Sequence, residues 1–308
     1  MSSFFACVGH ASVDHHFEID AFADKPTKTP AKSYRQIAGG MAAIASIAMA
    51  KLGLPVRLIG RVGDDDAGAF LQTALSQLGV MQMLEKVPGG HTSVSSVIVD
   101  ARGERQIFNH RGDALAKAQP LSTRALEGAL AVLTDPRWGD GAAAALIWAR
   151  ENHVLGVLDA DVAPLEVLQR LVPLAQWAVF SEPGLQCYVP QAATRQDALI
   201  AALDSGAKSA MVTLGEQGVM WMHADQRVLY KQASFAVQAM DTTGAGDVFH
   251  AALTFALSEL PSDHSLAQEK QAIAFACAAA ALKCTQRHGA LGAPTRAQVL
   301  QFLDTQSA

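Results

Sequence analysis

The sequence predicts an α/β protein with a doubly wound, mostly parallel β-sheet, and two observations carry this prediction. Short apolar runs of strand type alternate with alanine-rich runs whose apolar residues recur with the 3.6-residue period of a helix. Several strand-type runs are apolar almost throughout, which is typical of strands with helices on both faces of the sheet. Strands that alternate with helices along a chain favour parallel pairing through crossover helices.

The expected elements are spread along most of the 308 residues. The strand-type runs are residues 6–8, 56–59, 154–158, 178–180 and 210–213. The clearest helical periods are in residues 41–52, 67–78, 198–203, 248–257 and 268–284. One further strand-type run, residues 235–240, leads into a glycine-rich segment. A chain of this length is expected to form one large domain or two modest ones.

Two stretches interrupt this alternation. Residues 17–37 are polar and contain Pro26 and Pro30, and residues 91–112 hold two strand-like runs joined by a tetrad typical of a hairpin turn. We expect about residues 15–37 and 91–112 to form a small antiparallel β element that projects from the main sheet. Because its two parts come from separate regions of the chain, it is placed to cover one end of the main sheet as a lid.

Composition excludes several classes of protein. The net charge of −5 and the lack of a basic stripe argue against a nucleic-acid partner. The longest apolar runs, residues 39–50 and 272–282, fall short of the ~20 residues that cross a bilayer. The N-terminus lacks the basic start of a signal peptide, so we expect a cytoplasmic protein without a membrane partner. The cysteines have no metal-ligand spacing and are expected to be reduced thiols: Cys7, Cys187, Cys277 and Cys284.

The glycine-rich segment is residues 241–247, DTTGAGD, followed by a helical period. Its glycines permit a tight turn, and a turn that opens a helix presents free N–H groups to an anion. Asp247 would stand in the first turn, where the helix dipole favours an ionised carboxylate. Phosphoryl transfer needs positioning, charge neutralisation and a proton acceptor. We expect the amides of Ala245, Gly246 and Asp247 to hold the transferring phosphoryl group and Asp247 to accept the proton.

A simpler interpretation remains open at this point. A glycine turn with a capping aspartate is common and need not bind a phosphate. Two other phosphate motifs are excluded: no GxxxxGK[ST] occurs, and the GxGxxG fingerprint fails because Phe249 stands where its last glycine belongs.

The sequence DTTGAGDVFHAAL resembles the C-terminal signature of the ribokinase-like (PfkB) carbohydrate kinases. The N-terminal counterpart is present as AGGMAA at residues 38–43, KLG at 51–53 and GRVGDD at 60–65. The resemblance runs from Phe4 to about Leu303. It implies a three-layer α/β/α core with a small β-sheet lid, and one kinase domain over residues 1–308. It further implies an ATP-dependent sugar kinase that uses Mg²⁺ and forms a homodimer through the lid.

The resemblance also assigns roles to individual residues. It implies that Asp247 is the catalytic base and that Gly244, Ala245 and Gly246 form the anion hole. Asp14, Gly39 and Gly40 match the positions that bind the sugar. The positions that match the nucleotide loop are Thr213, Gly215 and Gly218. Asp241 and residues 289–292 resemble a region that holds a monovalent cation such as K⁺.

Two departures from the family pattern matter. Many members carry an Asn-x-x-Glu motif that organises Mg²⁺ through water, whereas this chain has Ser181-Glu182-Pro183-Gly184. Glu182 is the alternative candidate for that role, or ATP itself holds the metal. Ribokinases proper have an asparagine in the stretch that here reads Met41-Ala42-Ala43-Ile44, which argues against ribose as the substrate.

Within the family, five segments resemble the kinases of 6-deoxy-6-sulfofructose: residues 103–109, 135–141, 157–161, 180–185 and 281–285. A sulfonate is a permanent three-oxygen anion, and guanidinium, ammonium or amide donors recognise it. The resemblance implies this role for Asn109, Arg137 and Lys28, with Arg111 as an additional candidate. The expected product is the 1-phosphate. The alternatives are a fructokinase, a ketohexokinase, a sugar-phosphate kinase or a non-catalytic sugar sensor, and the intact GAGD sequence argues against the sensor.

Overall fold

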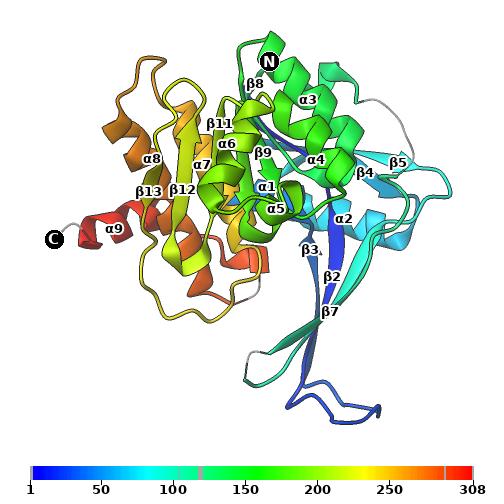
Figure 1. Cartoon of the computed structure of the whole chain (residues 1–308). Helices are drawn as coiled ribbons and strands as arrows, with labels where there is room; N and C mark the ends of the chain where they lie inside the picture. The colour runs from blue at the N-terminus through cyan, green and yellow to red at the C-terminus, as the bar shows by residue number, and fades with distance from the viewer. Residues whose placement is uncertain (1–2, 103, 117–120, 288, 307–308) are drawn as a thin grey trace.

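The structure is a computed structural model that describes residues 3–102, 104–116, 121–287 and 289–306 (Figure 1). Its described strands form two sheets. The large sheet has the order β13-β12-β11-β10-β9-β8-β1-β4-β5. Its strands are β1 (Phe4–Val8), β4 (Val56–Gly63), β5 (Met81–Val87), β8 (Ala129–Thr134), β9 (Leu155–Ala160), β10 (Trp177–Ser181), β11 (Ser209–Thr213), β12 (Val219–His223) and β13 (Tyr230–Gln232). All neighbours from β11 to β5 pair in parallel, and only β12 and β13 add antiparallel pairs.

Helices cover both faces of the large sheet. They are α1 (Met41–Lys51), α2 (Asp66–Gln77), α3 (Gly139–Glu151), α4 (Leu165–Leu171), α5 (Glu182–Tyr188), α6 (Arg195–Asp204), α7 (Ala245–Ser258), α8 (Leu266–Cys284) and α9 (Arg296–Gln306). Successive strand residues point to opposite faces. Val157 and Val179 accordingly pack with α1, α7 and α8, whereas their neighbours Leu158 and Phe180 pack with α3 to α6. The predicted three-layer α/β/α core is therefore confirmed.

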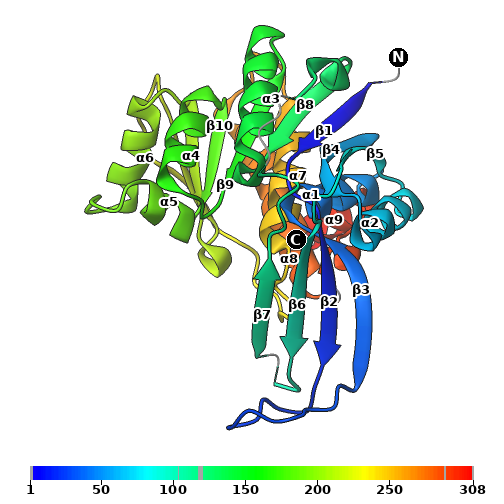
Figure 2. The same ribbon diagram turned by 90° about the vertical axis from the view of Figure 1, so that its right-hand side faces the viewer.

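The small sheet projects from one end of this core (Figure 2). It has the order β3-β2-β6-β7, from β2 (Ser12–Glu18), β3 (Ser33–Gly39), β6 (Ser93–Val99) and β7 (Arg105–His110). Two of its pairs are antiparallel as expected, but the central pair of β2 and β6 is parallel. The difference arises because each of these two strands leaves the core in the same direction and returns through its own hairpin partner.

One predicted strand is absent from the described structure: residues 235–240 belong to no sheet. The chain leaves β13 at the edge of the large sheet and then follows the end of α8 instead. There, the backbone N–H groups of Met240 and Asp241 both donate to the carbonyl oxygen of Cys284, at 2.7 and 3.1 Å. No helix among the described residues has both the length and the apolar character of a membrane span.

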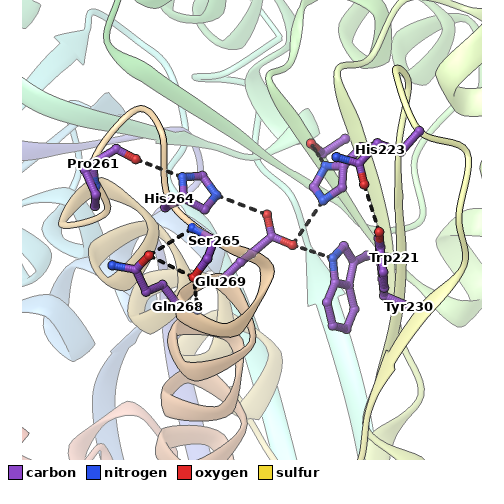
Figure 3. A network of polar contacts seen from close by, with 10 residues as sticks. Trp221, His223, Tyr230, Pro261, His264, Ser265, Gln268 and Glu269 are labelled. Carbon is purple, nitrogen blue, oxygen red and sulfur yellow. Dashed lines mark hydrogen bonds and ion pairs between the residues drawn. The ribbon is translucent and has the colours of Figure 1, made fainter.

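A buried carboxylate joins the start of α8 to the antiparallel edge of the sheet (Figure 3). Glu269 is nearly inaccessible and accepts hydrogen bonds from Trp221 Nε1 at 2.7 Å and His223 Nε2 at 3.0 Å. His264 Nε2 lies 3.3 Å from the same carboxylate, while its Nδ1 lies 2.9 Å from the Pro261 carbonyl. Burial raises the pKa of Glu269, but the contacts with His223, Trp221 and His264 outweigh burial and leave that pKa below its usual value.

We expect this cluster to make stability depend on acidity. A depressed folded-state pKa stabilises the fold above the unfolded pKa of about 4.3, and this stabilisation is lost as the pH falls through the folded value. Glu269→Gln should cost about 1–3 kcal/mol of unfolding free energy at pH 7, because it weakens the acceptor of buried donors. The variant should also lose less unfolding free energy than the wild type as the pH falls from 7 to 3. Urea unfolding from pH 7 to pH 3 measures both effects, with exposed Glu259→Gln as control; parallel curves for all three proteins would contradict the assignment.

Candidate active site

A cavity of about 360 Å³ lies where the carboxyl ends of the central strands meet α7 and the base of the small sheet. Six residues singled out from the sequence line it: Asp14, Gly40, Asn109, Arg111, Arg137 and Asp247. They come from β2, the start of α1, β7 and the residue after it, the loop after β8 and the first turn of α7. The remaining lining residues are His10, Ser12, Met41, Ile44, Ser95 and Asp161.

The start of α7 has the geometry of an anion site. Gly244 caps the helix with a left-handed φ of +76°, and a Cβ there would lie 3.1 Å from Ile44 Cγ2, so a side chain would meet both backbone strain and a steric contact. The Ala245 N–H donates to Thr242 O at 3.2 Å and closes the turn. Ala245 was expected to join the anion hole; with its amide engaged, the amides without an acceptor inside the helix are those of Gly246 and Asp247.

Asp247 stands beside these amides, among other carboxylates. Burial raises its pKa well above the usual aspartate value, and the charges of Asp135, Asp161 and Asp14 raise it further. The helix N-terminus acts in the opposite direction because it favours a negative charge. A carboxyl group whose pKa is raised toward neutrality accepts a proton more readily than an ordinary aspartate does.

The polar side chains of the small sheet face the same cavity. Ser12 Oγ donates to Asp14 Oδ1 at 3.1 Å, and Asn109 Nδ2 donates to Ser95 Oγ at 2.9 Å. Burial raises the pKa of Asp14, and the hydrogen bonds from Ser12 and Ser95 oppose that effect. Gly39 is required next to this carboxylate, because a Cβ there would lie 2.1 Å from Asp14 Oδ2.

Asp135, which sequence analysis did not single out, binds backbone groups of the segments that line the cavity. Its carboxylate accepts the backbone N–H of His10 at 2.7 Å, of Arg137 at 2.9 Å and of Ala42 at 3.2 Å. Burial raises its pKa to about 6 despite these bonds. Because these partners come from three separate segments, one carboxylate fixes the relative position of β1, α1 and the loop that carries Arg137. Its one sequence signal is an Asp-Pro pair at the start of a short helix.

Arg137 lines the cavity with a largely buried guanidinium group. Its Nη2 lies 3.4 Å from Asp161 Oδ2, whereas its Nη1 is buried without a hydrogen-bond partner among the described residues. A buried donor without a partner is costly, so an acceptor from a bound molecule is expected there. Arg111 adds a second positive charge to the lining. Burial lowers the pKa of His10 to about 4, so this third basic side chain is neutral near pH 7.

The candidate metal-binding side chains are arranged differently from the expectation. Glu182, proposed to organise Mg²⁺, is half-exposed and pairs with Arg195, with Arg195 Nε 2.7 Å from its Oε1. Asp161 lines the cavity instead and accepts Ser181 Oγ at 2.7 Å. Its charge is one of those that raise the pKa of Asp247. The described residues include no group of three or more His, Cys, Asp or Glu side chains that could hold a metal ion, and of the two carboxylates only Asp161 lines the cavity. A Mg²⁺ ion that keeps most of its water ligands needs few protein carboxylates, so Asp161 is better placed than Glu182 to bind it.

The expected nucleotide-loop residues lie at the same edge of the sheet but outside this cavity. Thr213 ends β11, Gly215 begins the short 3₁₀ helix η4 (Gly215–Gln217), and Gly218 follows its last residue. Both glycines have positive φ, at +57° and +88°, and a Cβ on Gly218 would lie 2.0 Å from Gln232 O. These residues form an open glycine turn two strands away from the end of β9.

Lys28 does not join the cavity within one chain. It is exposed in the loop between β2 and β3, at the far end of the small sheet, because the strands carry that loop away from the core (Figure 2). A different lid residue reaches the glycine-rich segment: Arg105 Nη1 on β7 lies 3.3 Å from Thr242 Oγ1 and 3.2 Å from Thr243 Oγ1.

Asp241 is surrounded by donors rather than by cation ligands. Its carboxylate accepts the N–H of Thr243 at 2.8 Å and of Gly289 at 3.0 Å, and Lys283 Nζ lies 3.5 Å from its Oδ2. Burial raises its pKa, but these contacts outweigh burial and bring that pKa to about 2. The residues present do not fit the monovalent cation expected here, because a lysine ammonium already occupies the position beside the carboxylate.

The chain resembles known proteins over nearly its whole length. The family model described as pfkB family carbohydrate kinase matches residues 2–296. The chain is 29% identical to the ribokinase of Haemophilus influenzae over 310 aligned positions, which cover 96% of this chain and 97% of that protein. It is 28% identical to fructokinase-1 of Zea mays, with 89% of this chain and 90% of that protein covered.

Two solved structures share the whole architecture. A protein from Agrobacterium tumefaciens provisionally named a ribokinase superposes with a TM-score of 0.91 at 32% identity and covers 100% of both chains. Arabidopsis thaliana ribokinase, solved with ribose and ATP, superposes with a TM-score of 0.84 at 25% identity, covering 98% of this chain and 99% of that one. With its two-sheet fold and its family match, the chain belongs to the pfkB family of carbohydrate kinases, ATP-dependent enzymes of the ribokinase and fructokinase type.

Proposed function

We propose that Asp247 is the general base of a sugar kinase and that the acceptor hydroxyl of the sugar lies against it. The observation that carries this proposal is the position of Asp247: it lines the cavity and begins the helix whose Gly246 and Asp247 amides are free of helical acceptors. These amides can hold the oxygens of the γ-phosphoryl group of ATP. The hydroxyl then attacks phosphorus, its proton passes to Asp247 and ADP leaves.

The sugar is placed between the base and the small sheet. Asp14 can accept hydrogen bonds from sugar hydroxyls, and Gly39 and Gly40 let the ring lie against the backbone. A Cβ on Gly40 would lie 2.7 Å from His10 O, so this approach depends on glycine. The loop with Thr213, Gly215 and Gly218 is the proposed nucleotide contact, because Gly215 has open space beside it at the same sheet edge.

Mg²⁺ would be held at Asp161, with waters completing its shell. When bound, it neutralises charge on the transferred phosphoryl group. The chain itself keeps Asp161 in place through the Ser181 hydroxyl at 2.7 Å. The two carboxylates therefore have different proposed roles. Asp161 would bind the metal ion beside the phosphates, and Asp247 would accept the proton of the acceptor hydroxyl.

For the substrate we propose a sugar with an anionic end, 6-deoxy-6-sulfofructose, phosphorylated at C1. The buried Nη1 of Arg137, which has no hydrogen-bond partner in the part of the chain that the structure describes, supports this proposal, as do Arg111 and Asn109 on the same cavity. A sulfonate offers three acceptors to these donors. The second candidate is an uncharged sugar, as the relatives named ribokinase and fructokinase suggest. Met41 lies in the cavity wall, and its thioether offers a sugar hydroxyl only a weak acceptor.

We propose that the small sheet acts as a lid on one kinase domain and pairs with the lid of a second copy. Arg105 ties the sheet to Thr242 and Thr243, next to the anion hole. Ile107, Phe108 and Tyr34 expose about half of their surface on the small sheet, as an interface between lids would require. Lys28, remote from the cavity of its own chain, would reach the substrate only across such an interface.

Asp247→Asn should lower kcat by about 10²–10⁴-fold, because the amide keeps the shape of the carboxylate but cannot accept the proton. Wild-type kcat/KM should fall on the acid side at a pH above that expected for an ordinary aspartate, since the pKa of Asp247 is raised. Coupled ADP release measures both, with exposed Asp263→Asn as control. A near wild-type rate for Asp247→Asn would remove the base assignment.

Arg137→Ala should raise KM for 6-deoxy-6-sulfofructose by about 10- to 100-fold, the effect of losing charge-assisted hydrogen bonds worth about 1.5–3 kcal/mol. Any turnover of fructose should change by less than about threefold, because fructose has no anion for this side chain to bind. The measurement is steady-state kinetics with 6-deoxy-6-sulfofructose, fructose and ribose as substrates. Arg170→Ala, at an exposed arginine, is the control. If the wild-type enzyme uses fructose as well as it uses the sulfosugar, the anionic-substrate proposal fails.

A further inference from the structure

One lysine is completely buried behind the glycine-rich segment. Lys283 lies in the last turn of α8, and its side chain has 0% exposure. Its Nζ donates to the backbone oxygen of Asp241 at 2.6 Å and lies 3.5 Å from Oδ2 of the same residue. A buried ammonium is costly unless it is paired and hydrogen-bonded. Here, one residue supplies both the counter-charge and the hydrogen-bond acceptor.

The partner of this lysine holds two segments together. The Asp241 carboxylate accepts the N–H of Thr243 on one side and of Gly289, in the 3₁₀ helix η5 (Gly289–Gly292), on the other. Two further N–H groups, those of Met240 and Asp241, donate to the carbonyl oxygen of Cys284 beside the lysine. The chain that enters the anion hole is therefore attached to the end of α8, with the ammonium at the centre of the attachment.

This attachment is next in sequence to the proposed phosphoryl site. Thr243 precedes Gly244, the residue with positive φ that opens α7, and Thr242 O holds the Ala245 amide. If the Asp241 carboxylate moved, Thr243 and the turn at Gly244 would move with it. The amides of Gly246 and Asp247 are two and three residues beyond Gly244, so their direction depends on this turn.

We propose that Lys283 is a built-in cation that positions residues 241–244, in place of the monovalent metal ion expected beside Asp241. An ammonium group and K⁺ are similar in size, and both bind carbonyl and carboxylate oxygens. The lysine provides this charge from within the chain, so the enzyme is expected to work without added K⁺. Lys283 acts through the backbone and is a positioning residue. The inference rests on the proposed role of the α7 amides in holding the phosphoryl group.

The test compares the wild-type enzyme with Lys283→Ala in KCl, NH₄Cl and choline chloride at equal ionic strength. Wild-type ADP release should change by less than about twofold between the salts. Lys283→Ala in choline should lose about 10- to 100-fold in kcat, the scale of a small misplacement at a reacting centre. Its KM for the sugar should change little. In KCl or NH₄Cl, the kcat of Lys283→Ala should be at least several-fold higher than in choline chloride, because the truncated side chain leaves room for the ion.

Three controls separate the outcomes. Lys270→Ala removes an exposed lysine from the same helix and should behave as wild type. Lys283→Arg keeps a charge and should retain more activity in choline than Lys283→Ala. Thermal unfolding provides a readout without turnover: KCl should raise the Tm of Lys283→Ala relative to choline but leave the wild-type Tm unchanged.

Three results would each overturn the proposal. The first is a wild-type enzyme that K⁺ activates several-fold over choline. The second is a Lys283→Ala protein that is fully active in choline. The third is a Lys283→Ala protein whose rate and Tm are the same in all three salts. If no sugar is phosphorylated by the wild-type enzyme, the proposed function fails, and the Tm comparison still decides the role of Lys283.

Discussion

The arrangement of this kinase depends on one electrostatic balance at Asp247. The first turn of α7 favours a negative charge there, whereas burial and the carboxylates of Asp135, Asp161 and Asp14 oppose it. The helix N-terminus alone would lower the proton affinity of Asp247, and burial alone would raise it. The cavity combines both influences at the residue proposed as the base, next to the backbone amides proposed to hold the phosphoryl group.

Two further carboxylates, the buried Asp135 and the partly buried Asp241, hold the backbone around Asp247 in place. Asp135 binds three amides and sets α1 and the Arg137 loop against β1. Asp241 binds two amides and, through Lys283, ties the glycine-rich segment to α8. Each acts as an acceptor for backbone that would otherwise lack partners, since glycine-rich turns form few hydrogen bonds of their own. Much of the site is loop, and these hydrogen bonds hold that loop backbone in place.

The sequence predicted the parts of the fold that depend on local pattern. Strand and helix periods predicted the layered α/β core, and the GAGD segment predicted a helix start that carries a carboxylate. Pattern failed at residues 235–240, because an apolar run does not reveal whether a sheet edge or a helix end is its neighbour. It also did not foresee the parallel pair of β2 and β6, which depends on how two distant segments leave the core.

The site was only partly predictable for a related reason. Asp14, Asn109, Arg137 and Asp247 carry motifs or family likeness, and the structure places all four on one cavity. Lys283 and Asp241 lie 42 residues apart, and Asp135 lies 125 residues from His10. No local signal connects such partners, so their roles emerged only from the three-dimensional contacts. Glu182 was a candidate from its position in the sequence, but in the structure its carboxylate pairs with Arg195 and does not line the cavity.

The central claim is that the fold itself raises the proton affinity of Asp247. The most direct measurement is an NMR titration of ¹³C-labelled aspartate side chains in the substrate-free enzyme, with the Asp247 signal identified by its loss in Asp247→Asn. The account predicts a titration midpoint well above that of an ordinary aspartate, at about 3.9. A midpoint at or below that value would contradict it, because the carboxylate would then be held by its helix alone.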